Sequence, residues 1–239
     1  MPYTFYDSEV LEIIDETESV KRFVLDIPGP EPFSFKAGQF VMLDLPIESR
    51  ITTRSYSIAS APGPDSRIEL LVVLKPGGAG TEYLFHKVRK GSRLKVSKAL
   101  GKFCLPDTLD REICFICTGT GIAPFRSMIL DLIHTGRPHQ GIHLLFGTRH
   151  YKDILYRQEW EENVLKLGHF DFTAVLSRET APIPGTAKGY VHEVYEGLFQ
   201  DRREASFYLC GWSEMLKEAR QRLANMGYGK EHIHFEPYD

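Results

Sequence analysis

Near the middle of the chain stands Ile113-Cys114-Phe115-Ile116-Cys117-Thr118-Gly119-Thr120-Gly121-Ile122-Ala123-Pro124, an apolar run and a glycine-rich turn that lead into a helical stretch. Glycines at a strand-to-helix turn let the backbone approach a bulky ligand, and the N–H groups at the start of a helix attract phosphate. Pro124 suits the first helical turn, where its missing N–H costs nothing. The stretch therefore predicts a nucleotide-binding strand–turn–helix unit. A tight turn without a ligand is the alternative, because the third glycine of the G-x-G-x-x-G pattern is absent.

The same order of elements repeats after this stretch. Apolar runs at 142–146, 170–176 and 207–210 alternate with segments of helical spacing at 158–165 and 213–226. Strands that alternate with helices form βαβ units around a parallel sheet. We therefore expect an α/β domain with a five-stranded parallel sheet.

The first half of the chain has a different pattern, in which short apolar segments are separated by turns rich in proline and glycine. The expected strands are 10–15, 21–26, 39–45, 53–58, 68–74 and 93–97. Six strands at this spacing, with little helical periodicity, predict a small antiparallel β-barrel. Because the pattern changes near residue 110, we expect two domains, residues 1–110 and residues 111–239.

Composition excludes several classes of protein. The 239 residues are 42% hydrophobic and 12% aromatic, which is too apolar for a disordered chain. The sequence contains no run of 18 apolar residues, so we expect no membrane span. The net charge of −3 argues against nucleic acid as a partner. Residues 1–7 show no export signal, and the chain has only four cysteines. We expect a soluble, cytoplasmic protein.

A possible ligand-binding strand is Arg54-Ser55-Tyr56-Ser57. Period-two geometry places Arg54 and Tyr56 on one face, where they offer a guanidinium for a phosphate and an aromatic plane for a heterocycle. Gly78-Ala79-Gly80-Thr81 opens a possible short helix and is a second candidate phosphate cradle. A strand with mixed faces and no ligand is the alternative.

A third set of polar residues, Ser177-Arg178-Glu179, follows the 170–176 run. A 2′-phosphate is bound by arginine and hydroxyl groups, whereas an NAD site places a carboxylate on the ribose. Ser177 and Arg178 favour the phosphate and Glu179 opposes it. Arg149, after the 142–146 run, adds a further positive charge, although a solvated arginine is the alternative at both positions.

Two other features bear on redox chemistry. Cys114 and Cys117 lie three apart in an apolar strand and face opposite sides, so we interpret them as packing residues. The nine histidines show no paired-ligand spacing, so we expect no metal. No four-cysteine spacing for an iron–sulfur cluster occurs, so we expect the electron partner to be a separate molecule. Residues 83–106 contain no Asp or Glu and form a basic segment that can dock an acidic carrier or simply be solvated. Its basic residues are Lys87, Arg89, Lys90, Arg93, Lys95, Lys98 and Lys102.

Four motifs occur in a fixed order along nearly the whole chain. They are Arg54-Ser55-Tyr56-Ser57-Ile58-Ala59-Ser60, Gly119-Thr120-Gly121-Ile122-Ala123-Pro124-Phe125-Arg126, Val175-Leu176-Ser177-Arg178-Glu179 and Leu209-Cys210-Gly211. Together they resemble the ferredoxin–NADP reductase family, and most of all its plant-type branch. Residues 100–103, Leu-Gly-Lys-Phe, resemble another segment of that family.

The resemblance implies an FAD site in the first domain. Arg54 would hold the pyrophosphate, with Ser55 beside it. Tyr56 would stack on the isoalloxazine, and Ser57 would form a hydrogen bond near flavin N5. Gly80 and Thr81 would bind the pyrophosphate from the opposite side.

The resemblance also implies an NADP site in the second domain. The turn residues Thr118, Gly119, Thr120 and Gly121 would accept the pyrophosphate. Ser177 and Arg178 would bind the 2′-phosphate, with Arg149 nearby, and Tyr190 would cover the adenine. Cys210 and Gly211 would lie beside nicotinamide C4.

The last residues also match a family feature. Plant-type members end on a Glu-x-aromatic triplet whose ring covers the flavin, and Glu236-Pro237-Tyr238 has this spacing, although Asp239 follows. We expect Tyr238 to stack on the flavin and Glu236 to join the active-site hydrogen bonds. A solvated end is the alternative, and Phe235 is a possible substitute ring.

The expected activity is electron transfer between NADPH and a separate one-electron carrier, ferredoxin or flavodoxin. Hydride would pass between nicotinamide C4 and flavin N5, with Ser57, Cys210 and Glu236 at the reacting atoms. One alternative is an NADH-dependent reductase that serves an oxygenase or cytochrome. Others are a non-catalytic flavin-carrying regulatory subunit and a nucleotide-binding domain without flavin.

Overall fold

The computed structural model describes residues 4–29 and 31–238, with the backbone alone for residues 164 and 165. Contacts divide the chain into two units. The first comprises Met1–Leu105 together with Ala123–Asp131, and the second comprises Pro106–Ile122 and Leu132–Asp239. Each unit has its own hydrophobic core. No helix among the described residues has the length and apolar character needed to cross a membrane.

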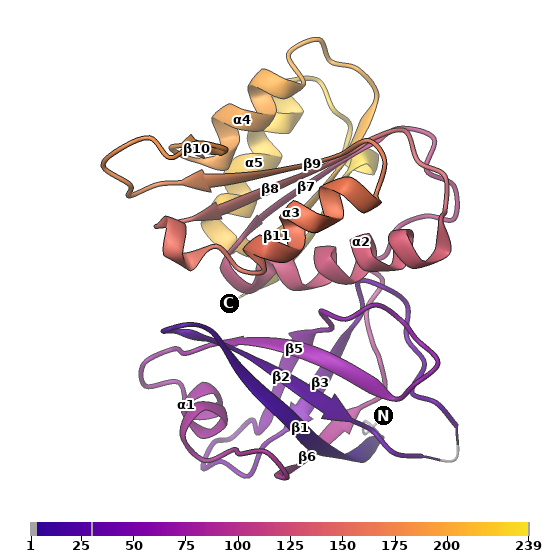
Figure 1. The fold of residues 1–239 in the computed structure, drawn as a ribbon, viewed down its shortest axis with the longest axis vertical. Helices are drawn as coiled ribbons and strands as arrows, with labels where there is room; N and C mark the ends of the chain where they lie inside the picture. Colours follow the sequence, from indigo (N-terminus) through magenta and orange to yellow (C-terminus); the bar gives the residue numbers. More distant parts are fainter. Residues whose placement is uncertain (1–3, 30, 239) are drawn as a thin grey trace. The chain divides into compact units, whose positions relative to one another are not determined.

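The first unit is built on a six-stranded antiparallel sheet in the order β4-β3-β6-β1-β2-β5 (Figure 1). The strands are β1 Phe5–Thr17, β2 Val20–Asp26, β3 Phe40–Asp44, β4 Thr53–Ser57, β5 Arg67–Val73 and β6 Arg93–Ser97, and α1 spans Ala79–His86. A bridge between Ile58 and Leu70 joins the two edge strands, and Ala59 N–H donates to the Glu69 carbonyl at 2.8 Å. The sheet therefore closes into the predicted barrel.

The burial pattern of β3 and the irregular pairing of β1 explain why this sheet forms a barrel. In β3, Val41 and Leu43 are buried and alternate with half-buried neighbours, so one face of the strand lines the core. Strand β1 pairs with both β2 and β6, and register shifts at Val10/Glu12 and Asp15/Thr17 interrupt its pairing with β2. Such bulges bend and twist a strand, which lets β1 curve around the core.

The first residues of helix α2 (Ala123–Thr135) belong to the barrel unit. Arg126 is almost fully buried, and its Nη1 donates to the Ala59 carbonyl at 2.9 Å and to Glu69 Oε2 at 2.8 Å. Ser127 Oγ donates to the Ser60 carbonyl at 2.6 Å. These contacts fix the segment that directly follows β4, a role for Arg126 and Ser127 that the sequence analysis missed.

The second unit is built on a parallel sheet in the order β10-β9-β8-β7-β11-β12. Its strands are β7 Glu112–Thr118, β8 Ile142–Thr148, β9 Phe170–Leu176, β10 Thr186–Lys188, β11 Ala205–Trp212 and β12 Ile233–Tyr238. The remaining α-helices are α3 Arg157–Lys166, α4 Val191–Leu198 and α5 Ser213–Asn225, and the 3₁₀ helices are η1 Gly119–Ile122, η2 Tyr151–Asp153 and η3 Lys230–His232. The parallel sheet is confirmed, but the described part of it has six strands rather than the predicted five.

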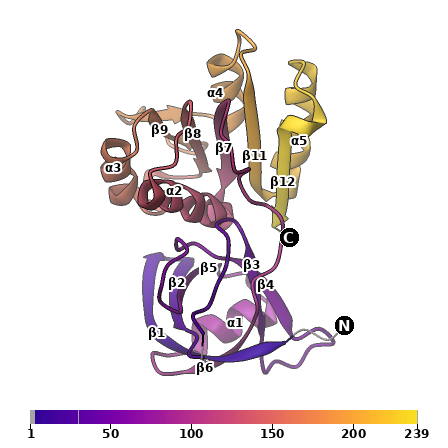
Figure 2. The ribbon, with the colours of Figure 1, turned by 90° about the vertical axis from the view of Figure 1, so that its right-hand side faces the viewer.

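Helices cover both faces of this sheet. Figure 2 shows α4 and α5 on one side and α3 on the other. Cys114 belongs to the core cluster that includes residues of α4 and α5, whereas α3 places Trp160 against Phe172 with ring centroids 5.8 Å apart. Cys114 and Cys117 are both fully buried, which fits their interpretation as packing residues. Burial raises the pKa of both thiols well above the ordinary value, so both stay protonated.

Candidate functional site

Strand β4 places the Arg54–Ser57 motif on an edge of the barrel sheet. Arg54 and Tyr56 are half-buried on the same face, Ser55 is exposed, and Ser57 is buried. Burial raises the pKa of Tyr56 to about 12, although the charge of Arg54 acts in the opposite direction. The phenol is therefore neutral at physiological pH and offers an uncharged ring beside a guanidinium.

Helix α1 begins against the Arg54 side chain. A Cβ on Gly80 would lie 3.0 Å from Arg54 Cγ and 3.2 Å from Nε, so only glycine fits here without displacing the arginine. Arg54 Nη1 donates to the Ile51 carbonyl at 2.7 Å and to the Thr53 carbonyl at 2.8 Å, which holds the guanidinium in place. The two segments that the sequence analysis singled out in this domain thus meet.

The start of α1 has the features of an anion site. The N-cap residue is Gly78, and no side chain caps the first N–H groups. The Thr81 hydroxyl instead contacts its own loop, where it donates to the Gly78 carbonyl at 3.1 Å and accepts from Lys75 N–H at 3.1 Å. Uncapped N–H groups beside a fixed guanidinium fit a pyrophosphate, so this cradle suits the FAD that the sequence predicts. Thr81 shapes the cradle as well as lining it.

In the second unit, the turn after β7 packs directly on the turn after β11. A Cβ on Gly121 would lie 2.5 Å from the Cys210 carbonyl oxygen and 2.7 Å from Gly211 N. A Cβ on Gly211, which has φ +127°, would collide with Thr118. Trp212 N–H also donates to Thr118 Oγ1 at 3.1 Å. Glycine at 121 and 211 therefore lets the turns after β7 and β11 meet backbone to backbone.

The β7 turn continues into α2 through the short helix η1. Gly119 has φ +54°, a conformation that favours glycine, and Thr120 is nearly buried. The N-cap of α2 is Ile122, which has no side-chain cap, and a proline occupies the first turn as predicted. The turn thus presents main-chain N–H groups without a competing side chain, which fits a second pyrophosphate.

The turns after β8 and β9 also pair. Ser177 N–H and Ser177 Oγ both donate to the Thr148 carbonyl, at 3.0 Å and 3.2 Å. Arg178 N–H donates to the Arg149 carbonyl at 3.0 Å, and both arginine side chains are exposed. Because these strands are parallel, this pairing gathers a hydroxyl and two guanidinium groups at the carboxyl edge of the sheet, where α/β sheets bind ligands.

Glu179, which opposed a phosphate site in the sequence, has a partner of its own. Its Oε1 accepts a hydrogen bond from Tyr151 N–H at 2.7 Å and lies 3.7 Å from His150 Nδ1. The carboxylate is thus engaged at the start of helix η2.

The C-terminal residues form strand β12 and not a solvated tail. Parallel pairing places Glu236 opposite Cys210 and Tyr238 opposite Trp212. Burial and the charge of Glu236 raise the pKa of the Cys210 thiol well above its usual value, against a hydrogen bond from Tyr238 that lowers it. The thiol is therefore neutral. Asp239 lies outside the described residues.

Two aromatic residues considered in the sequence have different surroundings. Phe235 lies under the guanidinium of Arg220, 3.9 Å from its ring centroid, and period two puts it on the face of β12 opposite Glu236. It therefore does not share a face with Tyr238. Tyr190 is the exposed N-cap residue of α4, just beyond β10.

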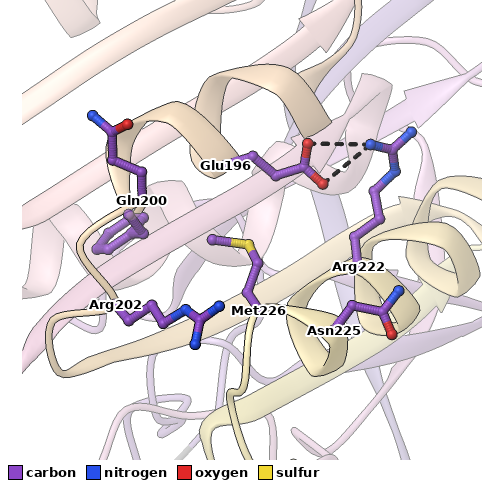
Figure 3. A pocket seen from close by; sticks show the side chains of 7 residues that line it. Glu196, Gln200, Arg202, Arg222, Asn225 and Met226 are labelled. Carbon is purple, nitrogen blue, oxygen red and sulfur yellow. Dashed lines mark hydrogen bonds and ion pairs between the residues drawn. The ribbon is translucent and has the colours of Figure 1, made fainter.

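A hollow of about 520 Å³ lies away from this carboxyl edge, between the ends of α4 and α5 (Figure 3). Its Glu196 accepts from Arg222 Nη1 at 3.1 Å and 3.2 Å. Helix α5 leaves the carboxyl end of β11, so Asn225 and Met226 at its far end place the hollow at the amino edge of the sheet. No predicted site residue lines it. Within the described residues, no cluster of His, Cys, Asp and Glu is arranged to hold a metal.

Comparison with known proteins assigns a domain family to each half of the chain. Residues 7–104 match the family described as an oxidoreductase FAD-binding domain, and residues 115–221 match the oxidoreductase NAD-binding domain. The chain is 34% identical to ferredoxin–NADP reductase B of Sorangium cellulosum over 241 residues, which cover 98% of each chain. It is 30% identical to the phenol hydroxylase P5 protein of Acinetobacter pittii, over 98% of this chain and 65% of that protein.

The fold is shared with solved structures. The crystal structure of a ferredoxin NADP+ reductase from Neisseria gonorrhoeae with bound FAD and NADP has a TM-score of 0.84 and 25% identity, with 99% of each chain covered. The family matches and the full-length identity show an FAD-binding enzyme that takes electrons from or gives them to NAD(P) and exchanges them with a partner. The chain belongs to the ferredoxin–NADP reductase family of FAD- and NAD(P)-binding oxidoreductases.

Proposed function

We propose that this enzyme transfers electrons between NADPH and a separate one-electron carrier protein, ferredoxin or flavodoxin, by hydride transfer between nicotinamide C4 and flavin N5. The preference for NADPH over NADH rests on the two hydrogen-bonded turns that follow β8 and β9. They gather Ser177, Arg149 and Arg178, while Glu179 is engaged with Tyr151 N–H. Arginine and hydroxyl groups are the usual ligands of a 2′-phosphate, whereas a carboxylate is the usual ligand of a ribose 2′-hydroxyl, and Glu179 Oε1 is held by the loop.

The barrel residues would bind and orient the flavin. Arg54 and the uncapped start of α1 would neutralise the pyrophosphate, and the neutral ring of Tyr56 would stack on the isoalloxazine. Ser57 is buried, and its hydroxyl would form a hydrogen bond near flavin N5. When bound, the flavin supplies the conversion between two-electron hydride chemistry and one-electron transfer.

The second unit would bind the dinucleotide along the carboxyl edge of its sheet. The turn at 118–121 would hold the pyrophosphate, and Cys210 and Gly211 would lie beside the nicotinamide. Because the Cys210 thiol stays protonated, it adds no negative charge that would hold the oxidised, cationic nicotinamide after the hydride has left. Glu236, in register with Cys210, is the nearby carboxylate that we propose joins the hydrogen bonds of this site.

The basic segment at 87–102 is the proposed docking surface for the carrier. Its Lys and Arg side chains are exposed, and two of them lie on β6. Lys95 is paired with Asp7 at 2.8 Å, so the residues in the α1–β6 turn and after β6 carry most of the uncompensated charge. Such a surface raises the encounter rate with an acidic partner, and salt weakens the effect.

The choice between NADPH and NADH is tested by Arg178→Ala. We expect KM for NADPH to rise at least tenfold, a loss of about 1.4 kcal/mol, with little change for NADH. The matched control is Lys166→Ala, which removes an exposed cation at the end of α3. Equal losses for both dinucleotides, or the same loss in the control, would contradict the 2′-phosphate site.

A second candidate is a reductase component that serves an oxygenase. The observation in its favour is the 30% identity to the phenol hydroxylase P5 protein, of which this chain spans 65%. The two functions differ in dinucleotide and in acceptor. Anaerobic stopped-flow measurements with NADPH and NADH, followed by mixing with ferredoxin, flavodoxin or an oxygenase component, separate them by the rate of flavin reduction and of flavin reoxidation.

A further inference from the structure

The two tryptophans of the chain have opposite surroundings. Trp160 is fully buried, whereas Trp212 is 67% exposed. An indole left in water forgoes the stabilisation that burial gives a large apolar side chain, and tryptophans on a protein surface are concentrated at binding sites. We therefore expect a ligand or a partner to cover the Trp212 side chain.

The backbone of Trp212 is fixed at the carboxyl edge of the second sheet. The residue ends β11 directly after Cys210 and Gly211, and its N–H donates to Thr118 Oγ1 at 3.1 Å. It is also in register with Tyr238 of β12. A large exposed ring is thus anchored between the two turns that meet backbone to backbone, beside the residues proposed to contact nicotinamide.

A second exposed ring, Tyr190, stands at the opposite end of the same edge, 66% exposed. Four strand-to-strand steps separate β10, which precedes Tyr190, from β11, a distance of about 19 Å at the usual strand spacing. Ser177 follows β9 and the phosphate turn follows β7, so both lie between the two rings. This order matches a dinucleotide laid along the edge, with adenine near Tyr190 and nicotinamide near Trp212.

We infer that the Trp212 indole is a stacking residue for the nicotinamide–ribose half of the dinucleotide, an inference that rests on the proposed NADP site. An indole face attracts a cation more strongly than a neutral ring. The oxidised nicotinamide carries a positive charge and the reduced one does not. Trp212 therefore stabilises bound NADP+ more than bound NADPH.

The first test is a set of affinities measured on the FAD-loaded enzyme. The ligands are NADP+, NADPH, oxidised nicotinamide mononucleotide, and adenosine 2′,5′-bisphosphate, which has no nicotinamide. For Trp212→Ala we expect a threefold to tenfold loss of affinity for NADP+ and for the mononucleotide, a smaller loss for NADPH, and no change for the bisphosphate. Trp212→Phe retains part of the affinity, because it keeps an aromatic face.

Tyr190→Ala is the matched control, since it removes an equally exposed ring from the adenine end. We expect it to weaken the bisphosphate and to leave the mononucleotide unchanged. The inference is overturned if Trp212→Ala leaves NADP+ and the mononucleotide unchanged, or weakens the bisphosphate to the same extent. If the unmodified enzyme binds none of these ligands, the proposed function fails as well.

The second test uses the emission of Trp212 itself. Acrylamide quenches exposed indoles, so in the unmodified enzyme it reports on Trp212 and not on buried Trp160. We expect NADP+ to protect the emission from acrylamide and adenosine 2′,5′-bisphosphate to give no protection. Equal protection by both ligands, or by neither, would overturn the inference without touching the 2′-phosphate site.

Discussion

Replacing Gly121 by alanine tests how the two turns of the second unit are held together. The added Cβ would lie 2.5 Å from the Cys210 carbonyl oxygen, 2.6 Å from the Cys210 carbonyl carbon and 2.7 Å from Gly211 N. All three are main-chain atoms, so no side chain can rotate away. To reach even a tight 3.0 Å contact, the turns must separate by about half an ångström.

The cost follows from this overlap. Forcing one methyl group into a packed site costs about 1–3 kcal/mol, and backbone contacts lie at the upper end because they relax least. We expect Gly121→Ala to lower the free energy of unfolding by about 2–3 kcal/mol. It should also weaken NADP+ binding at least tenfold, or about 1.4 kcal/mol, because the N–H groups that we propose bind the pyrophosphate move with the turn.

Gly119→Ala is the control within the same turn. Gly119 has φ +54° but open space around its Cβ position, so alanine there suffers backbone strain of about 1 kcal/mol and no collision. Urea unfolding with excess FAD gives the stability, and difference spectra of the flavin give the NADP+ affinity. Equal effects of the two substitutions on affinity would refute the steric argument, since only Gly121 abuts the Cys210–Gly211 backbone.

Three further predictions concern the barrel unit. Arg126→Met should lower the free energy of unfolding by about 3 kcal/mol, which is the low end for breaking a buried ion pair. The low end applies because Glu69 keeps its ion pair with Arg22. A loss below about 1 kcal/mol in urea unfolding would show that the Arg126–Glu69 pair is not stabilising. Tyr56→Ala should lower the FAD content of the purified enzyme while Tyr56→Phe retains it, and equal retention would remove the stacking role. Lys90→Glu with Lys98→Glu should slow reduction of an acidic carrier and flatten its salt dependence, with reduction of a small dye unchanged; parallel losses would place the docking surface elsewhere.

The regular elements of the chain could be predicted because their patterns are strong. Each of the six barrel strands coincides, to within a few residues, with a segment expected from the sequence. Elements were missed where the pattern is weak. Strand β10 has three residues and no apolar run, and β12 contains Glu236 and Pro237, which a lone strand would disfavour. Both lie at edges of the sheet, where one-sided pairing tolerates such residues.

The candidate site could be predicted in composition but not in arrangement. The sequence singles out Arg54 and Gly80, but only the structure shows that the glycine is required by the arginine packed against it. The sequence also gives no sign that Arg126, far along the chain, donates a hydrogen bond to the Ala59 carbonyl, just after the Arg54–Ser57 motif. These relations depend on contacts between distant segments, which no local pattern encodes.

Glu179 shows how a contact can reverse the meaning of a residue. In the sequence it stands next to Arg178 and weakens the case for a phosphate, because a carboxylate after this strand is the usual ligand of an NAD ribose. In the structure its Oε1 accepts from Tyr151 N–H at 2.7 Å, which holds the carboxylate at the start of helix η2. The position of this carboxylate in the sequence favours NAD, but in the structure the carboxylate stabilises the loop between β8 and α3. We therefore propose that the choice between the two dinucleotides depends on the exposed Arg178 and Arg149 and on the Ser177 hydroxyl.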